Sequence, residues 1–305
     1  SKIQYHMDEP LADPSAVALY FVCNLASEKL KVVLSGEGAD EIFGGYNVYS
    51  EPDGTAYDRL PKGVKKCIGS IAQKLPAKRG VNFFVRKGKD LEERFIGNAY
   101  MFTPAERKAL LRVKTNAPLP QDITKPYYDN VKNKDDVTKM QYLDLHLWMA
   151  GDILLKADKM SMANSLELRV PFLDKEVMSL AERIPLRYRV THKEYTDEHT
   201  KYITKYVMRL AAKKDTPKQT SKTAAKKKLG FPVPIRVWLK EEKYYNTVKS
   251  YFQSDISKKL FNTDMIIKLL DDHRNGKADN SRKIWTVFTF LVWYNVYFEN
   301  NGKFA

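Results

Sequence analysis

The chain has 305 residues, of which 43% are hydrophobic and 29% are charged. This composition is typical of a globular protein with one large core or two smaller ones, and it excludes an intrinsically disordered chain. We also expect no membrane contact, because the longest apolar stretches, such as 290–294, are far shorter than the ~20 residues that cross a bilayer.

The formal net charge of +15 has two interpretations. Basic residues attract polyanions such as ATP, pyrophosphate or nucleic acid through their summed field. The lysines, however, are scattered along the chain without regular aromatic interleaving, which favours an ordinary solvated surface. Nucleic-acid binding therefore stays the weaker alternative.

Cys23 and Cys67 are the two cysteines of the sequence, and neither has a second pair of metal ligands nearby. This pattern predicts neither a disulfide framework nor a zinc site. We therefore expect a reducing, cytoplasmic setting.

The N-terminal part predicts a helix, a strand and a glycine loop in succession. Residues 16–29 have apolar positions at helical spacing after a Pro-Ser start signal. The largely β-branched run 32–34 is typical of a buried parallel strand. Gly36 and Gly38 then let the chain turn sharply and bring backbone N–H groups close to a ligand. Because ligands in open α/β sheets bind beyond the carboxyl ends of strands, we place the chemistry at this junction.

Beyond the glycine loop the pattern is mostly helical. Residues 51–88 are rich in Lys, Gly and Pro, which predicts loops around one short helix near 64–75. A Thr-Pro-Ala-Glu sequence at 103–106 is typical of a helix start. The longest helical pattern covers 138–162, with Gly151 as the candidate break.

The remaining segments complete the expected organisation. Residues 174–184 and 200–212 predict helices, the first of them ended by the proline that follows. Residues 213–228 break the periodicity with Lys, Thr and Pro, and we expect an exposed loop there. The C-terminal aromatic side chains indicate core packing rather than a ligand site, namely Trp285, Phe288, Phe290, Trp293, Tyr294, Tyr297 and Phe298.

Three sequence blocks follow one another along the chain. The first is Leu-Ser-Gly-Glu-Gly-Ala-Asp-Glu at 34–41, followed by Phe-Gly-Gly-Tyr at 43–46. The second spans 152–174 and contains Lys-Ala-Asp-Lys-Met-Ser-Met and Leu-Glu-Leu-Arg-Val-Pro-Phe-Leu-Asp, and the third is Lys-Lys-Leu-Gly-Phe-Pro-Val-Pro at 227–234. With Asp-Glu-Pro and Ala-Asp-Pro-Ser upstream, they resemble the synthetase domain of glutamine-hydrolysing asparagine synthetases, a branch of the PP-loop ATP pyrophosphatases.

The resemblance covers most of the chain and implies an α/β fold. We expect a truncated PP-loop ATPase (adenine nucleotide alpha hydrolase-like) synthetase domain that is predominantly helical in this chain. The family's ATP-binding loop, Ser-Gly-Gly-x-Asp-Ser, does not occur in the sequence, and the first residue is not the Cys of a glutaminase nucleophile. We therefore interpret residues 1–305 as the C-terminal portion of the synthetase domain, with the glutaminase domain and the ATP loop upstream.

Amide formation from a carboxylate sets the chemical requirements of such a site. ATP converts the carboxylate into an acyl adenylate, and ammonia then attacks the carbonyl. The departing pyrophosphate needs Mg²⁺ held by carboxylates and at least one fixed cation. The attacking nitrogen must lose a proton, so a carboxylate base is needed near the acyl carbon.

The resemblance assigns these roles to particular residues. Glu37 is expected to remove the proton from the attacking nitrogen. The related β-lactam synthetases have an aromatic hydroxyl at this position, so a glutamate here indicates ammonia rather than an internal amine as the nucleophile. Asp40 resembles the residue that helps to bind Mg²⁺-pyrophosphate, and Lys228 the lysine that stabilises the departing pyrophosphate. Asp152 is expected to orient Lys228 through a salt bridge.

The nucleotide-binding assignments rest on the same first block. Ser35 and Gly36 resemble the pair that contacts ATP, and Gly38 belongs to the same loop. Taken alone, a glycine-rich acidic loop after a strand is as typical of an ordinary βα turn. Arg169 and Asp174 favour structural roles, the arginine in a buried ion pair.

The sequence therefore predicts the ammonia-using half of an ATP-dependent asparagine synthetase, which converts aspartate to asparagine through β-aspartyl-AMP. ATP and Mg²⁺ are the expected cofactors. The expected partners are aspartate, ATP and ammonia, released from glutamine by the upstream domain, and a homodimer stays open. One alternative is a family amidotransferase that acts on another carboxylate. The other is a non-catalytic binding module, because the isolated chain lacks the ATP loop.

Overall fold

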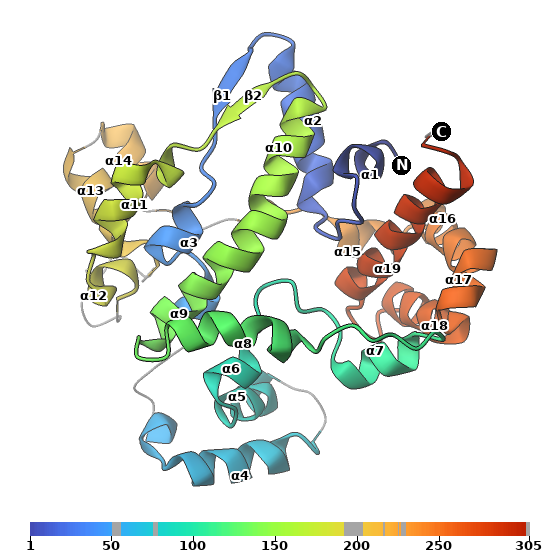
Figure 1. The fold of residues 1–305 in the computed structure, drawn as a ribbon, viewed down its shortest axis with the longest axis horizontal. Coiled ribbons are helices and arrows are strands. Elements are labelled where there is room, and N and C mark those ends of the chain that lie inside the picture. The colour runs from blue at the N-terminus through green and yellow to red at the C-terminus, as the bar shows by residue number, and fades with distance from the viewer. Residues whose placement is uncertain are drawn as a thin grey trace.

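The computed structural model describes residues 1–50, 56–75, 79–191, 204–215, 217–224, 226 and 230–302. This part of the chain is mostly helical, and two short parallel strands lie at one end of the molecule (Figure 1). The combination is consistent with the predicted α/β class and its helical bias.

The N-terminal unit supplies the first strand and the loop that follows it. It consists of α1 (Lys2–Met7), α2 (Ser15–Ser27), β1 (Val32–Leu34) and α3 (Ala39–Phe43). β1 pairs in parallel with β2 (Glu167–Arg169), so the predicted helix and parallel strand are confirmed. The expected burial of the strand is wrong, because Val32 is 56% and Leu34 76% exposed. Both side chains lie on the side of β1 that the described residues leave open.

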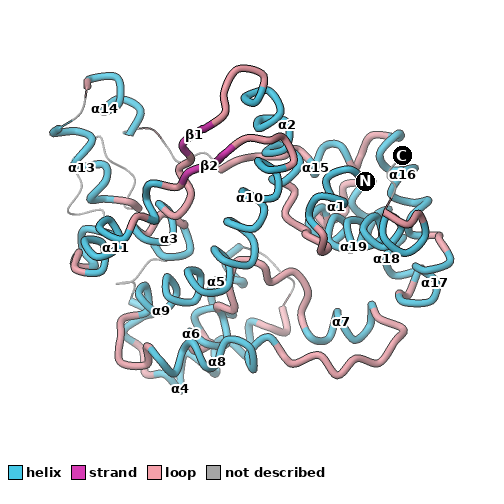
Figure 2. Tube along the Cα trace, turned by 45° about the horizontal axis from the view of Figure 1, so that its top comes forward, coloured by secondary structure: helices cyan, strands magenta, loops and turns pink. Residues whose placement is uncertain are grey.

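A central column of helix leads into β2. It comprises α9 (Asp136–Leu143), the π-helical η3 (Asp144–Leu154) and α10 (Leu155–Met162). The break expected at Gly151 is wrong, because the wider π-type turns let the helix continue through this position. Figure 2 shows the two strands beside the upper parts of α2 and α10.

The segment between the glycine loop and the central column is helical in short pieces. These are η1 (Asn47–Ser50), η2 (Ala56–Arg59), α4 (Lys62–Ala72), α5 (Arg79–Lys87), α6 (Leu91–Arg94), α7 (Pro104–Leu110) and α8 (Pro120–Asn130). The predicted start of α7 is confirmed, because the Thr103 side chain accepts a hydrogen bond from the Glu106 N–H. The prediction of a single helix within 51–88 is wrong, because a second helix, α5, packs on α4. A Cβ on Gly69 would lie 2.8 Å from the Gly88 Cα, so glycines that suggested loops allow close helix packing.

Further helices follow β2. They are η4 (Pro171–Leu173), α11 (Lys175–Glu182), α12 (Leu186–Arg189), α13 (Tyr206–Asp215) and α14 (Lys218–Ala224). Asp174 caps α11 by accepting a hydrogen bond from the Glu176 N–H at 2.8 Å, which confirms its structural role. The loop expected over 213–228 is wrong where the structure describes it, because α14 packs on α13.

The C-terminal bundle comprises the helices after residue 234: α15 (Ile235–Trp238), α16 (Glu242–Phe252), α17 (Asp255–Leu260), α18 (Thr263–Arg274), α19 (Ser281–Tyr294) and η6 (Asn295–Glu299). Its core contains the fully buried Phe252, Ile266 and Leu270. Trp285, Phe288 and Phe290 pack against this core, as predicted. The first part of the aromatic run therefore packs the bundle, whereas Trp293 and Tyr297 donate hydrogen bonds to the α1 segment and Phe298 is 60% exposed.

Two further features bear on the predictions from composition. In the described ranges, no helix has the length and apolar character needed to cross a membrane. Cys23 is buried and Cys67 is exposed, and both are free thiols.

Candidate active site

The loop after β1 combines a fixed backbone with an open position. The Ser35 N–H donates to the Arg169 carbonyl at 2.8 Å, which extends the strand pairing by one residue. Gly38 has a φ of +88°, and a Cβ there would lie 2.5 Å from Leu173 Cδ2, so a side chain is excluded. A Cβ at Gly36, by contrast, would meet no atom within 4 Å. The backbone at Gly36 is therefore accessible to a ligand.

Asp40, on the first turn of α3, is held by a cation. Its Oδ1 lies 3.0 Å from Lys205 Nζ, and both side chains are about three-quarters buried. Gly45 lies directly beneath this ion pair, because a Cβ there would be 1.8 Å from Asp40 Oδ1. The carboxylate is thus fixed beside the open loop.

Glu37 lies in a field of neighbouring charges. Burial raises the pKa of its carboxyl, the cation of Lys156 opposes this rise, and the carboxylates of Glu41, Asp40 and Asp13 add to it. A raised pKa brings a carboxylate nearer to the working range of a general base. Glu37 therefore has the electrostatic setting that proton removal requires.

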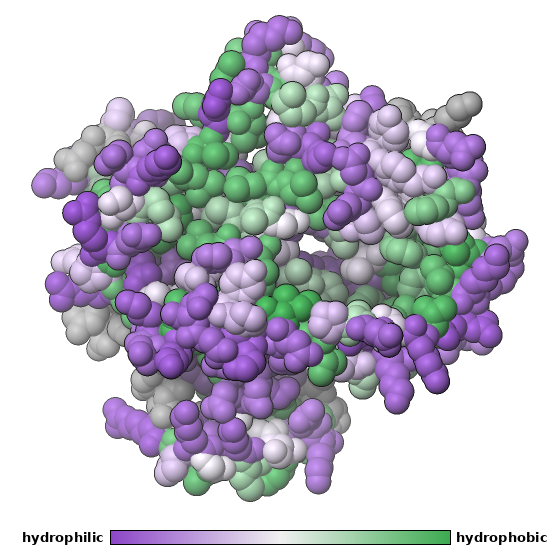
Figure 3. All heavy atoms as spheres, in the orientation of Figure 1, coloured by the Kyte–Doolittle hydropathy of each residue, from purple (hydrophilic) through white to green (hydrophobic). Residues whose placement is uncertain are grey.

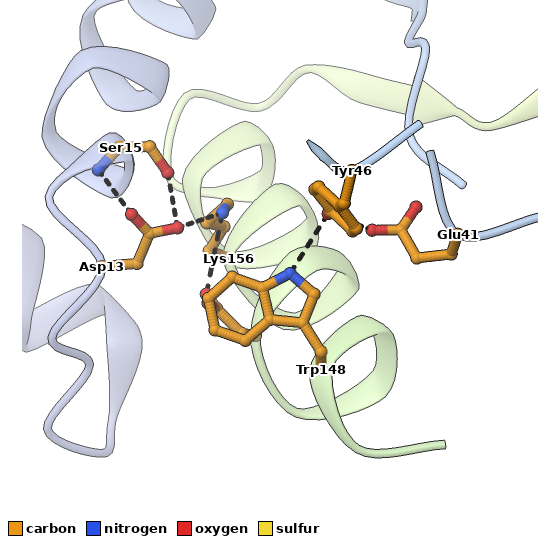
Figure 4. A network of polar contacts seen from close by, with 7 residues as sticks. Asp13, Ser15, Glu41, Tyr46, Trp148 and Lys156 are labelled. Atoms are coloured by element: carbon orange, nitrogen blue, oxygen red, sulfur yellow. Dashed lines mark hydrogen bonds and ion pairs between the residues drawn. The ribbon is translucent and has the colours of Figure 1, made fainter. Parts of the chain in front are cut away.

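Lys156 of α10 joins two carboxylates from different parts of the chain (Figure 4). It donates a hydrogen bond to Asp13, and its Nζ lies 3.6 Å from Asp152 Oδ1. Asp13 also accepts hydrogen bonds from the N–H of Ser15 at 2.9 Å and from its hydroxyl at 2.7 Å. Lys156 and Asp152 are both buried.

The two carboxyls beside Lys156 differ in their proton affinity. Burial works to raise the pKa of Asp13, but the charge of Lys156 and the bonds from Lys156 and Ser15 together hold it below its usual value. Burial raises the pKa of Asp152 to about 6, against the opposing charge of Lys156. The site therefore contains one firmly ionised carboxylate and one that titrates close to neutral pH.

A second polar network fixes α3 to the central column. The Tyr46 hydroxyl donates to the buried Glu41 and accepts a hydrogen bond from Trp148 Nε1 at 3.2 Å (Figure 4). Gln141 Nε2 donates to the Glu41 carbonyl at 2.6 Å. Glu41 is thus enclosed and hydrogen-bonded, and these contacts fix α3 to the central column.

A cavity of about 350 Å³ lies beside Asp152, lined by the segments 11–13 and 96–101, by α8, by η3 and by Arg282. Figure 3 shows hydrophobic residues gathered in the middle of the face in view, with hydrophilic residues below them. A larger groove of about 740 Å³ adjoins α4 and α6. Its walls carry paired charges of both signs, such as Lys66 and Asp90 at 2.9 Å, so we place the candidate site at the smaller cavity.

The described structure brings most of the predicted site residues together. Ser35, Gly36 and Gly38 form the open loop, and Glu37 and Asp40 carry its carboxylates. Asp152 joins them through Lys156. Lys228 lies outside the described residues, so the predicted Asp152–Lys228 contact stays a prediction.

Three further residues differ from the sequence predictions: Arg169, Lys156 and Asp13. Arg169 is exposed and pairs with Glu167 at 2.6 Å, so the expected burial of this ion pair is wrong. Sequence reasoning gave no role to Lys156 or Asp13. The four-residue spacing between Asp152 and Lys156 on a helix is a signal that predicts their contact. No local signal brings Asp13 to Lys156, because 143 positions separate them.

The donor set suits Mg²⁺ in one respect. Among the described residues no three His, Cys, Asp or Glu side chains form a ready-made metal cage. Mg²⁺ is usually held by one or two carboxylates together with substrate phosphates. Asp40, with a carboxylate held beside an open loop, fits that mode of binding.

Comparison with known proteins decides the family. The family model described as asparagine synthase matches residues 1–295. The chain belongs to this family. It is 45% identical over 300 residues to "Asparagine synthetase [glutamine-hydrolyzing] 1" of Bacillus subtilis, an alignment that covers 98% of the chain and 45% of the relative.

Two further relatives have similar descriptions. A "Putative asparagine synthetase [glutamine-hydrolyzing]" of Mycobacterium tuberculosis is 40% identical over 302 residues, covering 98% of the chain and 44% of the relative. The "Putative asparagine synthetase [glutamine-hydrolyzing] 2" of Methanocaldococcus jannaschii is 28% identical over 186 residues, covering 56% of the chain and 33% of the relative. The chain thus spans less than half the length of these relatives.

Proposed function

We propose that the chain contributes to ATP-dependent conversion of aspartate to asparagine through β-aspartyl-AMP, with ammonia from glutamine supplied by another domain. One observation carries the proposal: Glu37, on the open strand-end loop, is electrostatically coupled to the buried Lys156, and Asp40, on the turn of helix that follows, is held by Lys205. Family membership and the names of the relatives support the same reaction class.

In the proposed reaction the loop residues have separate tasks. The backbone at Ser35 and Gly36 faces the nucleotide, and Gly38 keeps the turn closed on α3. Asp40 would hold Mg²⁺, and the ion would supply charge neutralisation for the departing pyrophosphate. Glu37 accepts a proton from the nitrogen that attacks the acyl carbon. Lys228 is assigned to the departing pyrophosphate by resemblance.

We also propose that strands from another part of the protein complete the sheet beside β1, as the interpretation of residues 1–305 as the C-terminal portion of the domain implies. Apolar side chains of α2, of β1 and of the turn between them are half or more exposed, namely Phe21, Val22, Leu25, Leu30, Val32 and Leu34. Such a patch is typical of a surface that another segment covers. The open reading frame upstream of Ser1 tests this, since an encoded Ser-Gly-Gly-x-Asp-Ser loop supports the proposal and its absence contradicts it.

The function is tested with the longest natural chain that carries residues 1–305. Aspartate, MgATP and ammonia are supplied, and asparagine, AMP and pyrophosphate are measured. The proposal predicts the three products in equal amounts and no pyrophosphate without aspartate. Hydrolysis of ATP to ADP contradicts adenylation. Formation of AMP with another carboxylate but not with aspartate contradicts the assignment of aspartate. The cytoplasmic setting and the lack of nucleic-acid binding stay predictions, and the homodimer stays open.

A further inference from the structure

Asp8, the residue at which α1 ends, has a strained backbone. Its φ is +61° and its ψ is −38°. The Glu9 N–H donates to the Met7 carbonyl at 2.7 Å, so the three residues form a γ-turn of the rare positive-φ kind. Strain of this sort persists only where surrounding contacts over-determine the backbone. The neighbours of Asp8 therefore hold the turn in place.

Three side chains from distant elements contact the Asp8 turn. Trp293 of α19 donates its Nε1–H to the Asp8 carbonyl at 2.7 Å. The Tyr297 hydroxyl of η6 donates to the Tyr5 carbonyl at 2.6 Å and lies 3.3 Å from Asp8 Oδ1. Lys159 of α10 donates to the Asp8 carboxylate. Figure 1 shows α1 beside the end of α19, where the two termini of the chain come together.

The segment after the turn leads into the candidate site. Residues 9–14 connect Asp8 to α2 and contain two prolines, whose rings restrict the backbone. The buried Gln4 of α1 donates its Nε2–H to the Leu11 carbonyl at 3.0 Å. The segment is thus held at its start and in its middle, which leaves little freedom for Asp13, two residues after Leu11.

α10 fastens both ends of this segment. Lys159 binds Asp8, and Lys156, one helical turn earlier, binds Asp13. Residues three apart lie on the same face of a helix, so one face of α10 contacts two aspartates that are five positions apart. The side chains of the outer pair, Lys159 and Asp8, are 32% and 60% exposed, whereas those of the inner pair are 7% and 18% exposed. An exposed ion pair contributes little by itself, so the outer pair depends on the contacts from α19 and η6.

The inner pair controls the charge near Glu37. Burial raises the pKa of the Glu37 carboxyl, the cation of Lys156 opposes this rise, and the carboxylate of Asp13 adds to it. The share of the lysine charge that reaches Glu37 depends on how closely Asp13 neutralises it. A shift of residues 9–14 therefore changes the setting of Glu37 without moving Glu37 itself, which lies on another element.

We propose that Asp8, Trp293 and Tyr297 are positioning residues of the candidate site. Through them the helix formed by α19 and η6 holds Asp13 against Lys156. The assignment rests on the proposed function and deepens it, because it names the distant contacts that set the charge beside the proposed base. It predicts a specific defect: a loosened turn slows the attack of nitrogen on the acyl carbon and leaves adenylation unchanged.

Two substitutions loosen the turn, and each has a matched control. Trp293→Phe keeps an aromatic ring and removes the N–H that holds the Asp8 carbonyl. Its control is Trp285→Phe in the same helix, since Trp285 Nε1 has no hydrogen-bond partner among the described residues. Asp8→Gly removes the carboxylate but accepts a positive φ without strain, so the chain should still fold. Its control is Asp8→Asn, which tolerates the same φ and keeps an oxygen acceptor for Lys159.

Hydrogen exchange on the longest natural chain reports the position of Asp13. The Ser15 amide donates to the Asp13 carboxylate at 2.9 Å, so its exchange rate depends on that contact. Exchange at Ser15 should be about 2- to 10-fold faster in Trp293→Phe and in Asp8→Gly, which is the worth of one hydrogen bond. Trp285→Phe and Asp8→Asn should exchange at the native rate.

Kinetics on the same proteins separate positioning from a merely structural role. In Trp293→Phe and Asp8→Gly, aspartate-dependent exchange of labelled pyrophosphate into ATP should stay within twofold of the native rate. Asparagine formation should fall by about 10- to 100-fold, since small displacements beside reacting groups have effects of this size. The two control variants should match the native chain in both activities.

The outcomes distinguish this assignment from the proposed function. Unchanged Ser15 exchange in Trp293→Phe overturns the assignment, and so does an equal loss of pyrophosphate exchange and asparagine formation. A defect of the same size in Trp285→Phe also overturns it. Native asparagine formation in Trp293→Phe rejects the positioning role and keeps the proposed function. Faster Ser15 exchange in a protein that makes no asparagine leaves the hold on Asp13 standing and rejects the proposed function.

Discussion

The C-terminal bundle and the sheet apex, defined as α2, β1 and β2, use similar apolar residues in opposite ways. In the bundle, Leu270 and Ile266 are fully buried among helices that follow one another along the chain. At the sheet apex, Leu25 is 68% exposed and the sheet has two strands within the described residues. The core of the bundle is buried by helices that lie close together in the sequence, whereas the apex presents an open apolar surface. The candidate site begins directly below the apex, at the loop that follows β1, where the backbone at Gly36 is accessible.

A pair of leucine substitutions tests this contrast most strongly. Leu270→Ala in α18 should lower the free energy of unfolding by about 2–5 kcal/mol, because it leaves a cavity in the bundle. Leu25→Ala in α2 should change it by less than about 0.5 kcal/mol, since the side chain is mostly exposed. Urea unfolding of the 305-residue chain measures both. A large cost for Leu25→Ala there shows that the apex is already covered.

Two aspartate–lysine pairs separate function from stability. Asp40→Asn should lower asparagine formation by about 100-fold or more, because it removes a fixed charge from the proposed pyrophosphate site. Asp272→Asn in the bundle breaks the ion pair with Lys268, whose atoms lie 2.9 Å apart, and should leave the rate unchanged. Steady-state kinetics with the longest natural chain measures both. Equal rates of asparagine formation in the two variants contradict the role assigned to Asp40.

The central column, between the two regions, should make stability depend on pH. Burial raises the pKa of Asp144 to about 7, and the charge of Glu41 adds to this rise. The hydrogen bonds that Asp144 accepts from Tyr49 and Asn98 oppose it. The folded state therefore holds a proton that the unfolded chain releases near pH 4. Stability from this group is present below about pH 4, and is lost as the pH rises to about 7.

Asp144→Asn removes the ionisable group and keeps its size. Relative to the native chain, the variant should gain about 4 kcal/mol in unfolding free energy between pH 4 and pH 8, because the pKa of Asp144 differs by about three units between the folded and unfolded states. Denaturant titrations at both pH values measure the change. A constant difference between variant and native chain across this range disproves the raised pKa.

The smallest expected effect concerns the open loop. Gly36→Ala should leave the unfolding free energy within about 0.5 kcal/mol, because the added Cβ meets no atom within 4 Å. It should raise the KM for ATP by about tenfold, since the methyl group occupies the face assigned to the nucleotide. Gly63→Ala in α4, whose Cβ also meets no atom, is the matched control and should leave KM unchanged.

Local patterns explain which parts of the fold were predictable. The helix at 16–29, the strand at 32–34 and the capped start at 103 follow from short-range signals, and the structure confirms them. The glycines gave an ambiguous signal for loops and helix breaks. Gly69 allows two helices to pack closely, and Gly151 lies within continuous π-helical turns. Strand burial was not predictable from 32–34 alone, since it depends on what covers β1.

The site was predictable only in part, for a similar reason. The first block identified the loop with Glu37 and Asp40, and the helix spacing links Asp152 to Lys156. Asp13 and Arg282 reach the site only through the tertiary fold, across separations that no local pattern spans.

The central claim is that Glu37 acts after adenylation, on the attacking nitrogen. Aspartate-dependent exchange of labelled pyrophosphate into ATP reports adenylation alone, and asparagine formation reports the whole reaction. In Glu37→Gln the account predicts exchange close to the native rate, while asparagine formation falls by about 10²–10⁴-fold. Loss of both activities, or retention of both, contradicts the role assigned to Glu37.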